Sequence, residues 1–237
     1  MSTNISDPRI VPQSPNVGMR VSWITYGILV SFLVAMKLVI VATGLDVDGF
    51  AVVFSWLWLL GVSAAGVLGI FASHSAGFAS MWDCKTRTRA RFLAPGLIGI
   101  SFGLLTIYRD HLSSFAEIHL PLRVAIPAFS YGAIFIEILY RLFVLTTVVW
   151  FVSNVVLRHR GQVAVFWVVA CLLALLEPLT QGNGFTSPTD AFGFMLLFGE
   201  DVCEAWLFRR FGFLAAVSMR MGLYWTWHIL WIGLRTR

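Results

Sequence analysis

The residues of this chain best placed to do chemistry are charged side chains inside long apolar runs. Glu137 and Arg141 stand four residues apart within the apolar run 125–152. Residues four apart share one face of an α-helix, so the carboxylate and the guanidinium can pair within that helix. Each charge at the centre of a lipid-spanning helix costs about 2.5–3.5 kcal/mol. A pair retained there indicates either a lock between helices or a reactive site.

The predicted membrane spans contain more acids than bases. Nine ionisable residues fall inside them: Lys37, Glu137, Arg141, Glu177, Glu200, Asp201, Glu204, Arg220 and His228. Full ionisation of the five acids and three bases would leave about two uncompensated negative charges in a low-dielectric bundle, which is very unfavourable. A protonated carboxyl, a cationic His228 or a bound metal ion would each relieve this, and each favours a functional site.

Counting about 1.5 Å per residue along each helix places these groups at two depths. An outer group of Glu137, Glu177 and His228 is the predicted reactive site. An inner group is its predicted support, and its members are Glu200, Asp201, Glu204, Arg141 and Arg220. The candidate catalytic residues are Glu137, Arg141, Glu177 and His228. The candidate substrate-binding residues are Tyr224, Arg220, Glu200 and Glu204.

His228 has a functional and a plain interpretation. Arg220, Tyr224 and His228 recur at intervals of four and form one polar stripe on their helix. In the functional interpretation His228 carries a proton or, with Glu137 and Glu177, binds a divalent zinc-like ion with an open position for water. In the plain one it anchors the helix at the headgroups. Glu177, just before Pro178, likewise has a plain interpretation as an acid facing water near a helix end.

The composition indicates an all-α, polytopic transmembrane helical bundle. The 237 residues have a mean hydropathy of +0.81 and only 12% charged residues, where a soluble domain has about 25%. Residues 1–20 form a polar tail that is predicted to be disordered. Residues 21–237 form the membrane domain, in which seven apolar runs are long enough to span a bilayer: 21–43, 50–72, 92–108, 125–152, 163–180, 191–208 and 213–233.

The basic residues predict how the chain sits in its membrane. With a cytoplasmic N-terminus, ten Lys and Arg residues fall in inside segments and four in outside segments. Arg235 and Arg237 fall on the disfavoured side, so six or eight spans remain alternatives. The loop 74–91, with four basic residues, either binds anionic headgroups or sets orientation. No basic stretch is interleaved with exposed aromatic residues, so the positive charge does not predict a nucleic-acid partner.

Two stretches of the chain resemble the CPBP (Abi) intramembrane proteases, which include the CAAX prenyl endopeptidases. In the stretch 132–141, Glu137 and Arg141 match the second Glu and the Arg of that family's Glu-Glu-x-x-x-Arg motif, while Ile136 replaces the first Glu. The stretch 208–216 resembles the small-residue approach to the last motif, whose His would fall near Arg220. The Phe-x-x-x-His motif has no counterpart, since Ala170 lies four residues after Phe166.

The resemblance covers about 110 residues, with a family-like core at about 125–233. It implies a helical membrane enzyme in which paired Glu and His residues, with or without a metal, activate a water for peptide hydrolysis. Only Glu137 and Arg141 carry over residue by residue. Glu177 and His228 are our own candidates for the missing motif residues.

Three functions fit the sequence. The first is glutamate-dependent hydrolysis of a membrane-associated peptide or lipid-linked substrate, with Glu137 as general base. The second is a non-catalytic protein that binds and stabilises another membrane protein. The third is transport coupled to protons or ions through the buried acids. In all three the first partner is the lipid bilayer.

Overall fold

All regular elements in the described part of the chain are helices. The computed structural model describes residues 15–44, 53–82, 86–112, 120–180 and 187–231. The elements are α1 (Pro15–Ala42), α2 (Trp56–Ser75), η1 (Arg89–Leu93), α3 (Ala94–Leu112), α4 (Leu122–Ile136), η2 (Glu137–Leu145), α5 (Thr146–Trp150), η3 (Phe151–Val156), α6 (Gln162–Thr180), α7 (Pro188–Phe211), α8 (Phe213–Tyr224) and η4 (Trp225–Leu230). The η segments are π-helical continuations of neighbouring α-helices, so the described residues form seven helical rods, and the predicted all-α bundle is confirmed.

Five of the seven rods are long and apolar enough to cross a membrane. They are α1, α2, η1–α3, the rod from α4 to η3, and α6. These rods fit an integral membrane protein. α7 and α8–η4 are not among the five, and α7 carries three acids of the predicted site. Since α1 begins at Pro15, residues 15–20 of the predicted tail are helical, and residues 1–14 lie outside the described part.

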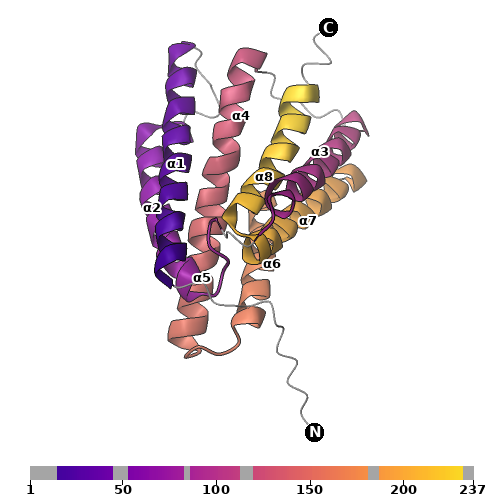
Figure 1. Cartoon of the computed structure of the whole chain (residues 1–237). Helices are drawn as coiled ribbons and strands as arrows, with labels where there is room; N and C mark the ends of the chain where they lie inside the picture. The colour runs from indigo at the N-terminus through magenta and orange to yellow at the C-terminus, as the bar shows by residue number, and fades with distance from the viewer. Residues whose placement is uncertain (1–14, 45–52, 83–85, 113–119, 181–186, 232–237) are drawn as a thin grey trace.

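The rod from Leu122 to Val156 is the centre of the bundle. α1 packs against α4 and α2 packs against η2 and α5 on one side. α8 packs against α4 on the other side, where α3 and α7 pack against α8 and α6 packs against α7 (Figure 1). The rod therefore joins the two halves of the molecule. Side chains at the middle of the rod can therefore contact one half of the molecule or the other, according to the face on which they lie.

Small residues bring two helix pairs into close contact. A Cβ at Gly99 would overlap the carbonyl of Met219, so the backbones of α3 and α8 touch. A Cβ at Gly69 would overlap the carbonyl of Leu142 in η2 in the same way. Gly61 differs, because a Cβ there would meet nothing within 4 Å.

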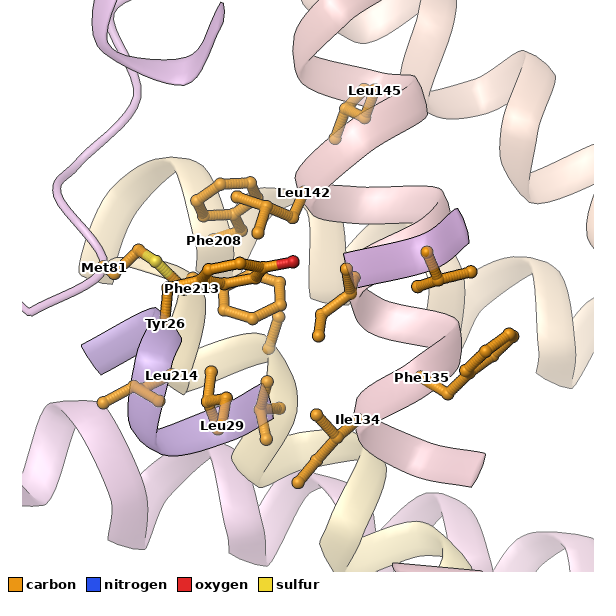
Figure 2. Packing of buried hydrophobic residues seen from close by; sticks show 14 of the residues in the cluster. Tyr26, Leu29, Met81, Ile134, Phe135, Leu142, Leu145, Phe208, Phe213 and Leu214 are labelled. Atoms are coloured by element: carbon orange, nitrogen blue, oxygen red, sulfur yellow. The ribbon is translucent and has the colours of Figure 1, made fainter. Parts of the chain in front are cut away.

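The apolar core lies between α1, the central rod and the α7–α8 junction. Figure 2 shows Phe208 and Phe213, on either side of this junction, beside Met81 and Tyr26. Gly212 makes the junction possible, because its φ of +94° suits glycine and a Cβ there would lie 2.5 Å from the carbonyl oxygen of Ser80. The sharp turn directs α8 back along α7, which brings Arg220 to the level of the acids of α7.

Candidate functional site

Seven charged side chains from four rods meet in the middle of the bundle. Their side chains are at most 3% exposed, and they are Glu137 and Arg141 of η2, Glu177 of α6, Glu200, Asp201 and Glu204 of α7, and Arg220 of α8. We call this set the charged cluster. It contains six of the eight residues that the sequence predicts as catalytic or substrate-binding, and Asp201 in addition.

Arg220 contacts all five acids of the charged cluster. Its Nε donates to Glu137 Oε1 at 3.1 Å, and its Nη1 donates to Glu177 Oε1 at 3.1 Å and lies 3.4 Å from Glu200 Oε1. Its Nη2 donates to Asp201 Oδ1 at 2.9 Å and to Glu204 Oε2 at 2.6 Å. The planar guanidinium with its five N–H groups suits this arrangement, which a lysine ammonium would not reproduce.

Arg141 contacts three of the same acids. It donates to Glu177 Oε2 at 3.0 Å, to Glu204 Oε2 at 3.0 Å and to Asp201 Oδ1. The three acids therefore bridge the two arginines. Glu177 does so with a separate oxygen for each guanidinium, while Asp201 offers one oxygen to both. The bridging ties the central rod to α6, α7 and α8.

The pairing of Glu137 with Arg141, which their spacing allows, is not the one that forms. Glu137 pairs with Arg220, and Arg141 pairs with acids of α6 and α7. Both residues belong to the π-helical segment η2, and both find their partners on neighbouring helices. Both side chains still face the charged cluster, but there Arg220 lies against Glu137 and the acids of α6 and α7 surround Arg141.

The predicted inner group of the three α7 acids with the two arginines is assembled, but its separation from the outer group is wrong. Glu137 and Glu177 share Arg220 with the supposed inner acids, so there is one cluster. His228 does not join it. Its ring stacks on Phe129 with centroids 3.9 Å apart and planes 3° apart, and it contacts the rings of Tyr224 and Trp227. Counting along each helix missed this because it ignores π segments and the tilt of one helix against another.

Tyr224 lies between His228 and the charged cluster. Its ring contacts His228 edge-on at 5.4 Å between centroids, and the guanidinium carbon of Arg220 lies 5.8 Å from the same ring. The stripe of Arg220, Tyr224 and His228 therefore exists as the sequence predicts. Only its Arg220 end reaches the acids.

The acids outnumber the bases in the charged cluster. Five carboxyl groups surround two guanidinium groups, so full ionisation would leave three negative charges uncompensated. Three acid oxygens, Glu137 Oε2, Glu200 Oε1 and Glu204 Oε1, are buried without a hydrogen-bond partner. A surplus of this size in a buried site is strongly unfavourable, so carboxyl groups of the cluster must hold protons.

The other two predicted remedies do not fit the geometry. His228 is surrounded by aromatic rings and cannot neutralise the acids. Among the described residues, no group of three or more His, Cys, Asp or Glu side chains is arranged to hold a metal ion. The predicted zinc-like set of Glu137, Glu177 and His228 is therefore not assembled, and the arginines occupy the space between the acids.

Sequence analysis missed a second buried ion pair, at the end of α3. Arg109 Nε donates to Asp110 Oδ1 at 2.9 Å, and Trp227 Nε1 donates to Asp110 Oδ2 at 2.7 Å. A Cβ at Gly193 would lie 2.5 Å from Arg109 Nη1, so the pair fixes α3 against both α7 and η4. The only signal was two adjacent opposite charges at the end of an apolar run, a pattern also typical of surface loops. The pair lies apart from the charged cluster, and its contacts indicate a structural role.

Comparisons with known proteins do not assign this chain to a family. No family model matches this sequence, and neither the comparison with curated proteins nor that with solved structures gives a match.

Proposed function

We propose that this protein is a membrane-embedded hydrolase that uses Glu137 as general base on a membrane-associated peptide or lipid-linked substrate. One observation carries the proposal. Glu137 is fully buried, its Oε1 is fixed by Arg220 at 3.1 Å, and its Oε2 has no hydrogen-bond partner. A general base needs a fixed carboxylate with one oxygen free to accept a proton.

In the proposed reaction the two oxygens of the Glu137 carboxylate have different roles. Oε2 of Glu137 accepts a proton from a water molecule, and the resulting hydroxide adds to the carbonyl carbon of the substrate. The proton then passes to the leaving amine or alcohol as the acyl bond breaks. Arg220 orients Glu137 and stabilises negative charge on the carbonyl oxygen. Glu177, Asp201 and Glu204 hold Arg220 in place and act as positioning residues.

Two further features support this assignment. Arg220 stands near the place where the last motif of the CPBP proteases carries its His, and it contacts the Glu that matches their first motif. An apolar groove of about 550 Å³ also runs beside α8, with Ile100, Met221 and Trp225 among its lining residues. The groove offers an apolar place for the acyl or prenyl chain of a substrate. His228 and a metal ion have no part in this proposal.

The test compares Glu137→Gln with a matched control in purified protein reconstituted in liposomes. The control is Asp190→Asn, which makes the same acid-to-amide change in the first turn of α7, outside the charged cluster. Substrates are quenched fluorescent peptides, with and without a farnesyl or acyl chain. We expect Glu137→Gln to lower turnover by about 10²–10⁴-fold and Asp190→Asn to leave it unchanged. Equal turnover of wild type and Glu137→Gln would refute the proposal.

A structural role is the second candidate, and a different observation favours it. All seven side chains of the charged cluster are buried, and they link four rods without any described link to the surface. Such a centre can serve as a lock in a non-catalytic protein that stabilises a membrane partner. In that case no substrate of the panel is cleaved by wild type. Glu137→Gln then changes only the unfolding of the protein, measured in detergent.

A further inference from the structure

Eight of the twelve arginines in the described part of the chain gather at one end of the bundle, which we call the basic end. They lie at the start of α1, before and within η1, in the turn between η3 and α6, and at the end of α7: Arg20, Arg87, Arg89, Arg91, Arg158, Arg160, Arg209 and Arg210. The starts of α1 and α6 and the end of η3 point to the lower part of Figure 1. Sequence position alone does not show that these groups share a surface, but the contacts of the intervening loop do.

The first half of the loop 76–82 lies across the ends of η3, α6 and α7. Asn154 Nδ2 donates to the carbonyl of Ser75 at 2.9 Å, and a Cβ at Gly77 would lie 3.1 Å from the Gln162 side chain. Phe78 contacts the rings of Phe166 and Phe208. The η3–α6 turn with Arg158 and Arg160 and the end of α7 therefore border the same loop.

The second half of the loop joins the remaining elements to this end. Met81 N donates to Ser22 Oγ at 3.3 Å near the start of α1, and Ser80 approaches Gly212 at the α7–α8 junction. η1 packs against α8 next to that junction. Arg20, Arg87 and Arg89 thus surround the same surface, and all three are exposed.

Acids do not balance this charge in the described part of the chain. The described acids lie either in the charged cluster or, as Asp110 and Asp190, at the opposite end of the bundle. Asp110 is near the end of α3 and Asp190 is in the first turn of α7. The basic end therefore carries a one-sided field that attracts anions.

Arg209 gives this end a more specific feature. Its guanidinium carbon lies 4.4 Å from the centre of the Phe166 ring and 5.9 Å from that of Phe78. Its Nη1 is buried without a hydrogen-bond partner. Arg209 as a whole is half-buried, so a guanidinium whose plane the ring faces fix can present its accessible N–H groups to a phosphate oxygen.

Trp82 places the same surface at the level of lipid headgroups. It is 38% exposed, and its ring lies 4.0 Å from the guanidinium carbon of Arg91. Tryptophan concentrates at membrane–water interfaces, and arginines beside an interface bind acidic headgroups. From these observations we infer that the basic end is a binding surface for the phosphate groups of anionic phospholipids in the adjoining leaflet, with Arg209 as one fixed contact.

The test uses the full chain in neutral detergent, where both ends are accessible. Native mass spectrometry measures binding of added phosphatidylglycerol and phosphatidylcholine. The main variant is Arg158→Gln, Arg160→Gln and Arg210→Gln together, because all three side chains are exposed and their loss spares the core. The matched control is Arg123→Gln, an exposed arginine at the start of α4, at the opposite end.

Wild type should bind phosphatidylglycerol in preference to phosphatidylcholine, and the triple variant should lose about 10- to 100-fold of that affinity. Arg123→Gln should keep it. Arg209→Gln alone should weaken phosphatidylglycerol binding at unchanged thermal unfolding. Equal affinity for the two lipids, or an equal loss in Arg123→Gln, would overturn the inference. So would full displacement of the lipid by inorganic phosphate or a short DNA duplex at matched charge, because either would indicate a surface for soluble polyanions.

Discussion

The acids of the charged cluster differ in their contacts with the two arginines. Asp201 offers one oxygen to both arginines, whereas Glu200 lies at 3.4 Å from one arginine and leaves that oxygen without a hydrogen bond. Removing negative charge from a cluster with surplus acids relieves repulsion, but removing a bridge also releases two guanidinium groups. The balance between these effects depends on the contacts of each acid.

Asp201→Asn and Glu200→Gln separate these two effects, since both replace a carboxylate by an amide of the same shape. We expect Asp201→Asn to lower the free energy of unfolding by about 1–3 kcal/mol, because charge-assisted bonds to both arginines weaken. Glu200→Gln should change it by about 1 kcal/mol or less, or raise it, because little contact is lost and surplus charge is removed. Unfolding in mixed detergent, followed by tryptophan fluorescence, gives both values. Equal losses would show that the acids are not ranked by their contacts.

At the scale of elements, the apolar runs predicted the rods well, because a helix that faces lipid must be apolar over its whole length. The same pattern could not reveal η2. Nor could it reveal that Glu137 would pair with Arg220 of α8 while Arg141 pairs with acids of α6 and α7. The residues of the charged cluster were thus predictable from their cost in a membrane, while their pairing depended on which helices become neighbours, which sequence does not show.

Gly99 and Gly61 test how close contact between rods sustains the charged cluster. A Cβ at Gly99 would overlap the carbonyl of Met219, the residue before Arg220, whereas a Cβ at Gly61 would meet nothing within 4 Å. We expect Gly99→Ala to lower the free energy of unfolding by about 1–3 kcal/mol, because α8 must move away from α3. Gly61→Ala should leave it unchanged or raise it by up to about 1 kcal/mol, because alanine favours a helix over glycine. Detergent unfolding measures both, and a cost for Gly61→Ala equal to that of Gly99→Ala would contradict the close contact.

For the whole molecule, the excess of arginine in alternate loops was predictable from sequence, since it requires only the order of spans and loops, while the gathering of these residues on one surface needed the contacts of the loop 76–82. The site was not predictable, because it depends on which rods become neighbours. α6, α7 and α8 meet the central rod through the turn at Gly212 and the small residues of α3. His228 is an example. The sequence correctly placed it on one helix face with Arg220 and Tyr224, but it could not show that its neighbours are aromatic rings of α4 and η4.

The basic end also predicts the orientation of the chain, with the starts of α1 and α6 on the cytoplasmic side. Two exposed histidines at opposite ends provide matched probes: His159 in the η3–α6 turn and His111 in the last turn of α3. In a variant whose three native cysteines are replaced by serine, His111→Cys should react with a membrane-impermeant maleimide in intact cells. His159→Cys should react only after lysis, since arginine-rich loops stay on the cytoplasmic side. The reverse pattern would place the basic end outside, and labelling of both in intact cells would mean that the rods between them do not separate the two compartments as the spans require.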